Sequence, residues 1–301
     1  MKTERTFRIH RITDEYQGLT VEQYLKSHLQ LSGRKIQKLT RLKGILLNNK
    51  PVYLQKKLKA GNTVSVLELS DRSYGVDPEP GDIDILFEDD QIIVLNKPAG
   101  LLVHPAGQTA RGTLANYLAA YFAQKGKVCT IRPLHRLDRD TSGCVAFAKD
   151  PLSQSLLEKQ LAEGSFKRSY LAIVQGVLEP PAGTIDAPIG PHPLKANRRA
   201  ISPQGEKAIT HYRTVCTFQG MSLLALELET GRTHQIRVHL AALGHPVIGD
   251  KMYGKSSPLI KRQALHAWSL EFLHPEDGRR IAVQAPLPSD FAFFEVPDLP
   301  F

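Results

Sequence analysis

The sequence contains few cysteines and no long apolar run. Its 301 residues include only Cys129, Cys144 and Cys216, and none of them belongs to a CxxC pair. Three isolated cysteines build neither a disulfide framework nor a thiolate metal cage, and they fit a reducing cytoplasm. No stretch of about 18 consecutive apolar residues occurs, so we expect no membrane span. Residues 1–16 are charged throughout and lack the apolar segment of a signal peptide.

Acidic residues are scarce between Gly18 and Ser70. Ten lysines and arginines lie there against Glu22 and Glu68, a net charge of +8 in a chain whose total is +9. Such a concentrated positive charge favours a polyanionic partner. A solvated helix face is the alternative, but ten cations against two anions exceed what solubility requires.

The same residues have the pattern of a small folded unit. Apolar residues at helical spacing predict a helix near 20–29, with Thr20 as N-cap and Gln23 at the capping-box position. A second helix is predicted near 32–44. The pair Asn48-Asn49 predicts a tight hairpin turn, because asparagine tolerates the left-handed conformations that such a turn needs.

The second predicted helix has one basic face. Arg34, Lys38 and Arg41 recur at intervals of three and four residues and therefore share a side of the helix. Together with the neighbouring Lys35, they are the residues that we expect to contact RNA. Two helices and a few strands with a basic helix face resemble the small RNA-binding domain named after ribosomal protein S-four, over residues 18–70.

The rest of the chain has a different composition. Residues 70–82 are rich in proline and turn formers, which is typical of a linker. Beyond them, strands and helices are interleaved without regular βαβ spacing and without a glycine-rich phosphate loop. We therefore expect an RNA-binding domain at 1–75 and, at 76–301, one large catalytic domain of the α+β class with a mixed sheet.

A dense group of charges precedes a predicted buried strand in RPLHRLDRDTSGCVAFAKD, residues 132–150. If residues 136–140 are extended, Arg136, Asp138 and Asp140 lie on one face. A nearby cation would keep a partly buried carboxylate ionised, which is the state that a nucleophile needs. A purely structural ion pair at the strand end is the alternative, and these residues alone do not decide between the two.

A second candidate lies at 223–246, where a half-buried strand leads through a turn into a helix that Thr233 can cap. Arg232 lies at this junction, from which a side chain can reach a cleft. His234 and His239 invite a metal interpretation. They are five residues apart, about 140° around a helix, whereas the zinc arrangement uses i and i+4. We expect no metal here.

Two further segments could touch a nucleic acid. Tyr170 begins a predicted strand; such an aromatic is usually part of the core, but beside a nucleic-acid cleft it could stack on a base. A loop rich in proline and asparagine within 190–212 holds Lys195, Arg198 and Arg199, which suit phosphate contacts. A flexible, solvated loop is the alternative.

Five blocks, in order along about residues 80–290, resemble the RluA-type pseudouridine synthases. The central motif of that family is matched without a gap by HRLDRDTSG, residues 135–143. The other blocks are NKPAGLLVHP (96–105), KRSYLAIVQG (167–176), TGRTHQIRVHLAALGHPVIGD (230–250) and LHAWSLEFLHP (265–275).

The resemblance implies isomerisation of uridine in RNA, with large-subunit ribosomal RNA as the expected substrate. It implies that Asp138 is the catalytic carboxylate, Tyr170 the aromatic that packs on the base, and Arg232 the ion-pair partner of Asp138. Leu265 would line the pocket. We also expect Arg136 to hold the backbone of the flipped nucleotide, because it precedes Asp138 on the same face.

The chemistry of this reaction needs neither a cofactor nor a metal, because no atoms are gained or lost and no electrons leave. A carboxylate can add to the anomeric carbon of the sugar, as in retaining glycosidases, or assist an elimination there. The sequence does not separate these routes. A uracil inside a helix is out of reach, so it must flip into a pocket.

Two other functions remain as alternatives. The first is a non-catalytic RNA-binding or ribosome-associated factor with the same fold. The second is a metal-dependent phosphoesterase built on His135, Asp138 and Asp140. A transfer RNA substrate also stays open. We expect a monomer that acts in the cytoplasm.

Overall fold

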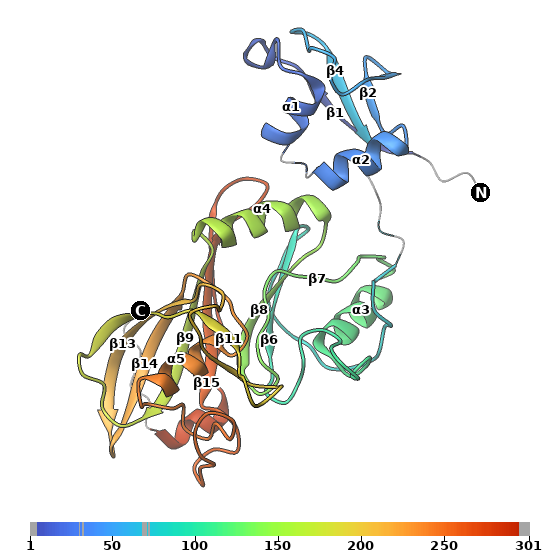
Figure 1. Ribbon diagram of the computed structural model, residues 1–301. Coiled ribbons are helices and arrows are strands. Elements are labelled where there is room, and N and C mark those ends of the chain that lie inside the picture. Colours follow the sequence, from blue (N-terminus) through green and yellow to red (C-terminus); the bar gives the residue numbers. More distant parts are fainter. Residues whose placement is uncertain (1–4, 30, 32, 68–70, 72, 295–301) are drawn as a thin grey trace. The chain divides into compact units, whose positions relative to one another are not determined.

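The computed structural model describes residues 5–29, 31, 33–67, 71 and 73–294 (Figure 1). The chain divides into two compact units, residues 1–72 and residues 73–301. The sequence predicts the division three residues later, between 75 and 76. Within the described ranges, no helix combines the length and the apolar character needed to cross a membrane.

The first unit is a four-stranded antiparallel sheet with two helices. The strand order is β1-β4-β2-β3. Its elements are β1 (Phe7–Arg11), η1 (Asp14–Tyr16), α1 (Val21–Ser27), α2 (Gly33–Arg41), β2 (Ile45–Leu47), β3 (Lys50–Pro51) and β4 (Thr63–Leu67).

Local sequence signals place these elements as predicted. The Thr20 side chain accepts from the backbone N–H of Gln23, and the Gln23 side chain accepts from that of Thr20, so the capping box that begins α1 is confirmed. Asn48 and Asn49 have φ values of 50° and 65°, which turn the chain tightly between β2 and β3. This confirms the predicted hairpin.

The helix α2 has a buried face and a basic face. Ile36 and Leu39 are buried in the core of the first unit. Lys38 and Arg41 are exposed on the other side, and Lys35 is half-buried. The side chain of Arg34 lies outside the part of the chain that the structure describes. The predicted basic surface is thus present at Lys38 and Arg41.

The second unit contains a ten-stranded sheet. Its main path runs β10-β13-β14-β9-β15-β8-β6-β5, with β16 paired to β15 and β7 paired to β8. β15 and β8 are parallel, whereas β9–β15 and β6–β8 are antiparallel, which confirms a mixed sheet. The strands are β5 (Asp84–Glu88), β6 (Ile92–Lys97), β7 (Arg132–Pro133), β8 (Ser142–Ala148), β9 (Lys167–Gln175), β10 (Ala182–Asp186), β13 (Ile209–Phe218), β14 (Met221–Leu228), β15 (Leu265–Leu273) and β16 (Arg280–Gln284).

Helices cover both faces of this sheet (Figure 1). Along β6, Ile93 and Leu95 belong to one core and Ile92 and Val94 to another, because successive side chains of a strand point to opposite faces. α3 and α5 contribute to the first core and α4 to the second. These helices are α3 (Leu114–Gln124), α4 (Pro151–Glu163) and α5 (Gln235–Ala242), and a short helix η2 (Ser289–Phe294) follows the last strand.

A separate hairpin projects beside α5. It consists of β11 (Ile189–Pro191) and β12 (Arg199–Ile201). Its base is anchored by Ile189, which packs with Val238 of α5 and with Tyr253. The loop between the two strands is largely exposed.

Gly143 allows the two parallel strands at the centre of the sheet to meet. Its φ is +110°, and a Cβ atom there would lie 2.1 Å from the carbonyl oxygen of Ala267 in β15. Only glycine tolerates both the conformation and the contact. The glycine of the TSG turn therefore fixes the start of β8, and with it the preceding loop, against β15.

Candidate active site

Asp138 lies in the loop that joins β7 to β8. The backbone N–H of Thr141 donates to the Asp138 carbonyl at 3.1 Å, which closes a turn over 138–141. The expectation of an extended chain over 136–140 is therefore wrong for residues 138–140, which belong to this turn. Arg139 points away to donate to the Gly100 carbonyl, and Asp140 does not line the cleft described below.

Lys97, at the end of β6, forms hydrogen bonds that fix this loop. Its fully buried ammonium donates to the carbonyls of Pro98, Leu101 and Arg139 at 2.8, 2.8 and 2.9 Å. The three donors of an ammonium group are thus all used. Because one acceptor is the residue that follows Asp138, Lys97 ties the loop to the rigid sheet.

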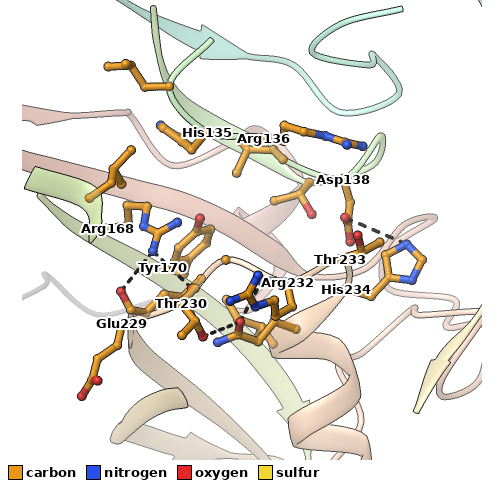
Figure 2. A pocket seen from close by; sticks show the side chains of 18 of the residues that line it. His135, Arg136, Asp138, Arg168, Tyr170, Glu229, Thr230, Arg232, Thr233 and His234 are labelled. Carbon is orange, nitrogen blue, oxygen red and sulfur yellow. Dashed lines mark hydrogen bonds and ion pairs between the residues drawn. The ribbon is translucent and has the colours of Figure 1, made fainter. Parts of the chain in front are cut away.

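A cleft of about 680 Å³ opens above Asp138 (Figure 2). Tyr170, on β9, and Leu265, at the start of β15, both line it, and both are almost fully buried. Arg136 lines the cleft from the loop and is exposed. The cleft thus brings together five of the predicted site residues, these four and Arg232. Its remaining walls come from residues 133–137, residues 228–237 and α4.

The ion-pair partner of Asp138 is Arg237. The Arg237 Nη1 donates to Asp138 Oδ2 at 2.8 Å. The same guanidinium makes a two-pronged pair with Asp250, with Nε to Oδ2 at 2.7 Å and Nη2 to Oδ1 at 2.9 Å. The Arg237 side chain is only 7% exposed. Its contacts with two carboxylates hold the guanidinium in one orientation.

The prediction that Arg232 pairs with Asp138 is wrong. Arg232 forms an ion pair with Glu206 and donates to the Lys207 carbonyl at 3.0 Å. It precedes α5 in an exposed turn, whereas Arg237 lies in the first turn of the helix on its buried side. The N-cap of α5 is also His234 and not Thr233. Arg232 still lines the rim of the cleft.

Burial and charge act against each other at the Arg237–Asp250 pair. Burial alone would raise the pKa of Asp250, but the hydrogen bonds and the charge of Arg237 outweigh it, so that pKa is lowered. Burial likewise opposes the charge on Arg237, and the hydrogen bonds and charges of Asp250 and Asp138 outweigh it and raise its pKa. Both groups are therefore ionised at neutral pH.

His234 faces the other oxygen of Asp138. Its Nε2 lies 4.0 Å from Asp138 Oδ1, and Figure 2 shows the two side chains directed toward each other. On its far side, His234 Nδ1 lies 2.8 Å from the hydroxyl of Tyr253. Burial, assisted by the charge of Arg237, lowers the pKa of His234 despite the attraction of Asp138. The ring is therefore neutral at pH 7.

Arg168 and Tyr170 form the floor of the cleft on β9. Arg168 Nη2 donates to the carbonyls of Leu228 and Thr230, which fixes the end of β14 where the chain turns toward α5. Tyr170 lies beside it (Figure 2), and burial raises the pKa of its hydroxyl. An aromatic side chain is thus held within a polar cleft that Asp138 also lines.

The remaining predicted contacts lie outside the cleft. Lys195 and Arg198 lie in the loop of the β11–β12 hairpin, and Arg199 begins β12. The backbone N–H of Arg199 donates to the Tyr253 hydroxyl at 2.8 Å, which connects the hairpin to His234. The structure therefore links this loop to the cleft without placing the three side chains in it.

The metal-dependent alternative finds no support. Nε2 of His135 accepts from the backbone N–H of Ala146, and burial lowers the pKa of this histidine to about 3. Among the described residues, no three histidine, cysteine, aspartate or glutamate side chains are grouped so that they could hold a metal ion. His135 is part of the packing of the loop and not a partner of Asp140.

Sequence reasoning missed Arg237, Asp250, His234 and Tyr253 as members of the site. A signal for Arg237 exists in the sequence, because it lies between Ile236 and Val238 on a helix that is expected to pack into the core. A charged side chain buried there needs a partner. The other three depend on contacts between segments that are distant in the chain.

Together these features define an enzyme class. A carboxylate held by a buried guanidinium, an aromatic side chain beside it and a cleft of nucleotide size fit chemistry on one extruded nucleotide. The comparisons with known proteins agree. A family model described as RNA pseudouridylate synthase matches residues 91–242, and one described as the N-terminal domain of RluD ribosomal pseudouridine synthase matches residues 9–64.

Curated proteins match over nearly the whole chain. The uncharacterized RNA pseudouridine synthase YhcT of Bacillus subtilis (strain 168) is 42% identical over 281 residues, which are 93% of each chain. Ribosomal large subunit pseudouridine synthase D of Nitrosomonas europaea is 40% identical over 294 residues, 93% of this chain and 85% of that protein. The solved structure of human RNA pseudouridylate synthase domain containing 1 is 30% identical, has a TM-score of 0.57, and covers 71% of this chain and 90% of its own.

The chain therefore belongs to the RNA pseudouridylate synthase family. It is an enzyme that isomerises uridine to pseudouridine in RNA. The non-catalytic alternative has no support from the cleft, in which the carboxylate and its buried partner are both in place.

Proposed function

We propose that the protein isomerises uridines of large-subunit ribosomal RNA, with Asp138 as the catalytic carboxylate. The observation that carries the proposal is the ion pair between Asp138 Oδ2 and Arg237 Nη1 at 2.8 Å inside the cleft. With one oxygen held, Oδ1 is directed to the space that a nucleotide would enter.

Asp138 acts at the sugar of the flipped nucleotide. The bond between N1 of uracil and the anomeric carbon breaks, and the base turns and reattaches through its C5 atom. The C5 hydrogen then leaves as a proton and N1 takes up a proton, so the product has the same composition as the substrate. Asp138 either adds to the anomeric carbon or assists an elimination there, and the cleft geometry suits both routes.

The neighbours of Asp138 receive the base and the backbone. Tyr170 stacks on the flipped uracil and recovers part of the few kcal/mol that unstacking costs. Leu265 supplies an apolar wall. Arg136 holds the phosphate backbone; it is exposed at the cleft, and the described residues offer it neither a hydrogen bond nor an ion pair.

Two basic surfaces extend the contact with RNA. On the first unit, the exposed residues Lys38 and Arg41 of α2, with Arg34 and Lys35 beside them in the sequence, dock the phosphate backbone. On the second unit, Lys195, Arg198 and Arg199 do so from the β11–β12 hairpin. Contacts of this kind fix the position and orientation of an RNA without reading its sequence.

Ribosomal RNA is favoured by the names of the relatives. The proteins of Nitrosomonas europaea and Xanthomonas campestris, both 40% identical, are ribosomal large subunit pseudouridine synthases D. We further propose that the protein acts in the cytoplasm, where this RNA is found, and as a monomer.

Mapping pseudouridines in cells tests this proposal. Cells that lack the protein should lose pseudouridine at one or more positions of large-subunit ribosomal RNA. Wild-type protein should restore them and Asp138→Asn should not, at equal protein levels. Losses confined to transfer RNA would contradict the substrate, and full restoration by Asp138→Asn would contradict the assigned role.

A further inference from the structure

One oxygen atom can bridge His234 Nε2 and Asp138 Oδ1. Nε2 and Oδ1 are 4.0 Å apart, which is too long for a hydrogen bond. An oxygen at about 2.8 Å from both atoms would subtend about 90° between them, which suits a hydroxyl group. Both side chains line the cleft and are partly exposed, at 16% for His234 and 22% for Asp138, so a nucleotide can reach this space.

The hydrogen bonds behind His234 favour one of its two tautomers. The Tyr253 hydroxyl accepts from the backbone N–H of Arg199 at 2.8 Å, which favours donation of its own hydrogen to His234 Nδ1 at 2.8 Å. Nδ1 is then the acceptor of the neutral ring, and the N–H is at Nε2. The space is therefore bounded by one donor, Nε2–H, and one acceptor, Asp138 Oδ1.

The backbone at His234 indicates that this orientation is imposed by the fold. His234 has φ 60° and ψ 19°, a left-handed conformation that is uncommon for a residue other than glycine. The ring also packs edge-on against Tyr253, with the centroids 5.6 Å apart. Such strain is retained where the surrounding structure holds it, and it clusters at sites that bind or react.

One atom of a nucleotide within an RNA chain fits between a donor and a carboxylate. The bridging atom must accept from Nε2–H and donate to Oδ1. Ring oxygen O4′ and the uracil carbonyls only accept, N3–H only donates, and the 3′ and 5′ oxygens carry phosphates. The 2′-hydroxyl does both. It is also attached to the carbon next to the anomeric centre, where Asp138 acts.

We propose that His234 is a specificity-determining residue that donates a hydrogen bond to the 2′-hydroxyl of the target uridine, while that hydroxyl donates to Asp138. The pair thereby selects ribose over 2′-deoxyribose and places the sugar against the carboxylate. This inference rests on the proposed function, because it needs Asp138 to act at the sugar.

The test measures the rates on two target sugars, each with wild type and with a variant of His234. One RNA oligonucleotide carries uridine at the target position and a second carries 2′-deoxyuridine there, with ribose elsewhere. Single-turnover rates are measured for wild type and for His234→Phe, which keeps a ring but lacks the donor. His245→Phe, beyond the other end of α5 and outside the cleft, is the matched control. Circular dichroism confirms that each variant is folded.

The loss of either partner of one hydrogen bond should cost about tenfold to 100-fold in rate. Wild type and His245→Phe should therefore prefer ribose by that factor. His234→Phe should be slower by a similar factor on the ribose substrate. Removal of the 2′-hydroxyl should then slow it by a clearly smaller factor than it slows wild type, because only the hydrogen bond to Asp138 is left to lose. His234→Gln, which restores an N–H, should regain part of the preference.

Two results would overturn the inference. His234→Phe that still prefers ribose as strongly as wild type would show that the hydroxyl is recognised elsewhere or that a water fills the space. Equal rates of wild type on the two sugars would show that the hydroxyl is not recognised. Wild type that makes no product even from the ribose substrate would instead contradict the proposed function, and the inference with it.

Discussion

The carboxylate of Asp138 meets the guanidinium of Arg237, 99 residues further along the chain, at 2.8 Å. Arg237 is held in turn by Asp250, which is only 1% exposed. The loop that carries Asp138, the helix α5 and the turn after it are therefore joined by one guanidinium. Removal of this group should affect both the fold and the chemistry.

Arg237→Met should destabilise the protein more than Arg232→Met. Loss of Arg237 leaves two carboxylates without their partner, one of them buried, which should lower the free energy of unfolding by about 3–5 kcal/mol. Arg232 pairs at the surface, so its loss should cost about 1 kcal/mol or less. Thermal unfolding of the two variants checks the difference. Equal shifts in melting temperature would contradict the assignment of the ion pair.

Gly143→Ala should prevent the parallel contact between β8 and β15. The added Cβ would lie 2.1 Å from the Ala267 carbonyl, so the strands must separate. Gly164→Ala is the matched control, because Gly164 has φ +76° but open space around it. The control should lower the free energy of unfolding by about 1–2 kcal/mol through backbone strain. Gly143→Ala should lower it clearly more and should also abolish activity. Similar unfolding curves for the two variants would show that the close approach is unimportant.

The charge on α2 should appear in the salt dependence of RNA binding. Each phosphate contact contributes about 0.7–0.9 to the slope of log affinity against log salt, so Lys38→Ala with Arg41→Ala should reduce the slope by about 1.4–1.8. Lys127→Ala with Lys261→Ala removes the same charge from exposed positions of the second unit. This control should change the slope less. An unchanged slope in the α2 variant would mean that the first unit does not dock RNA.

Glu88 should stabilise the second unit in a pH-dependent manner. Partial burial raises its pKa, but the hydrogen bonds from Lys149 and Tyr121 and the charge of Lys149 outweigh this and lower it to about 2. The ordinary value is 4.5. Because the pKa of the folded state is the lower one, the stabilisation is complete above pH 4.5 and is lost as the pH falls through about 2.

Glu88→Gln tests this relationship. The variant should unfold at a lower temperature than wild type at pH 7, and the difference should shrink between pH 4.5 and pH 2. Glu163→Gln, at an exposed surface pair with Lys159, should have little effect at either pH. A difference between Glu88→Gln and wild type that stays constant down to pH 2 would contradict the account.

Local signals in the sequence predicted most of the fold. The capping box at Thr20 and the turn at Asn48-Asn49 are determined by neighbours in the chain, and the structure confirms both. The strand order could not be read in this way. It depends on contacts such as that between Gly143 and Ala267, which are distant in sequence.

Only part of the site was predicted, because the site also depends on contacts that are distant in sequence. Asp138, Tyr170, Leu265 and Arg136 come together in one cleft. The partner of Asp138 was misassigned, because the side chain at a strand-to-helix junction was favoured over the buried one in the helix that follows. Arg232 precedes α5 and Arg237 lies in its first turn, and only the packing of α5 decides which of them faces the carboxylate.

The central claim, that Asp138 isomerises uridine with Arg237 as its partner, is tested most directly with RNA tritiated at C5 of uracil. Formation of pseudouridine releases this hydrogen to water, so the released tritium counts the turnover. Wild type should release it without any added metal or cofactor, and Asp138→Asn should be slower by at least about 1,000-fold while it binds the same RNA. Release by Asp138→Asn at the rate of wild type would contradict the claim.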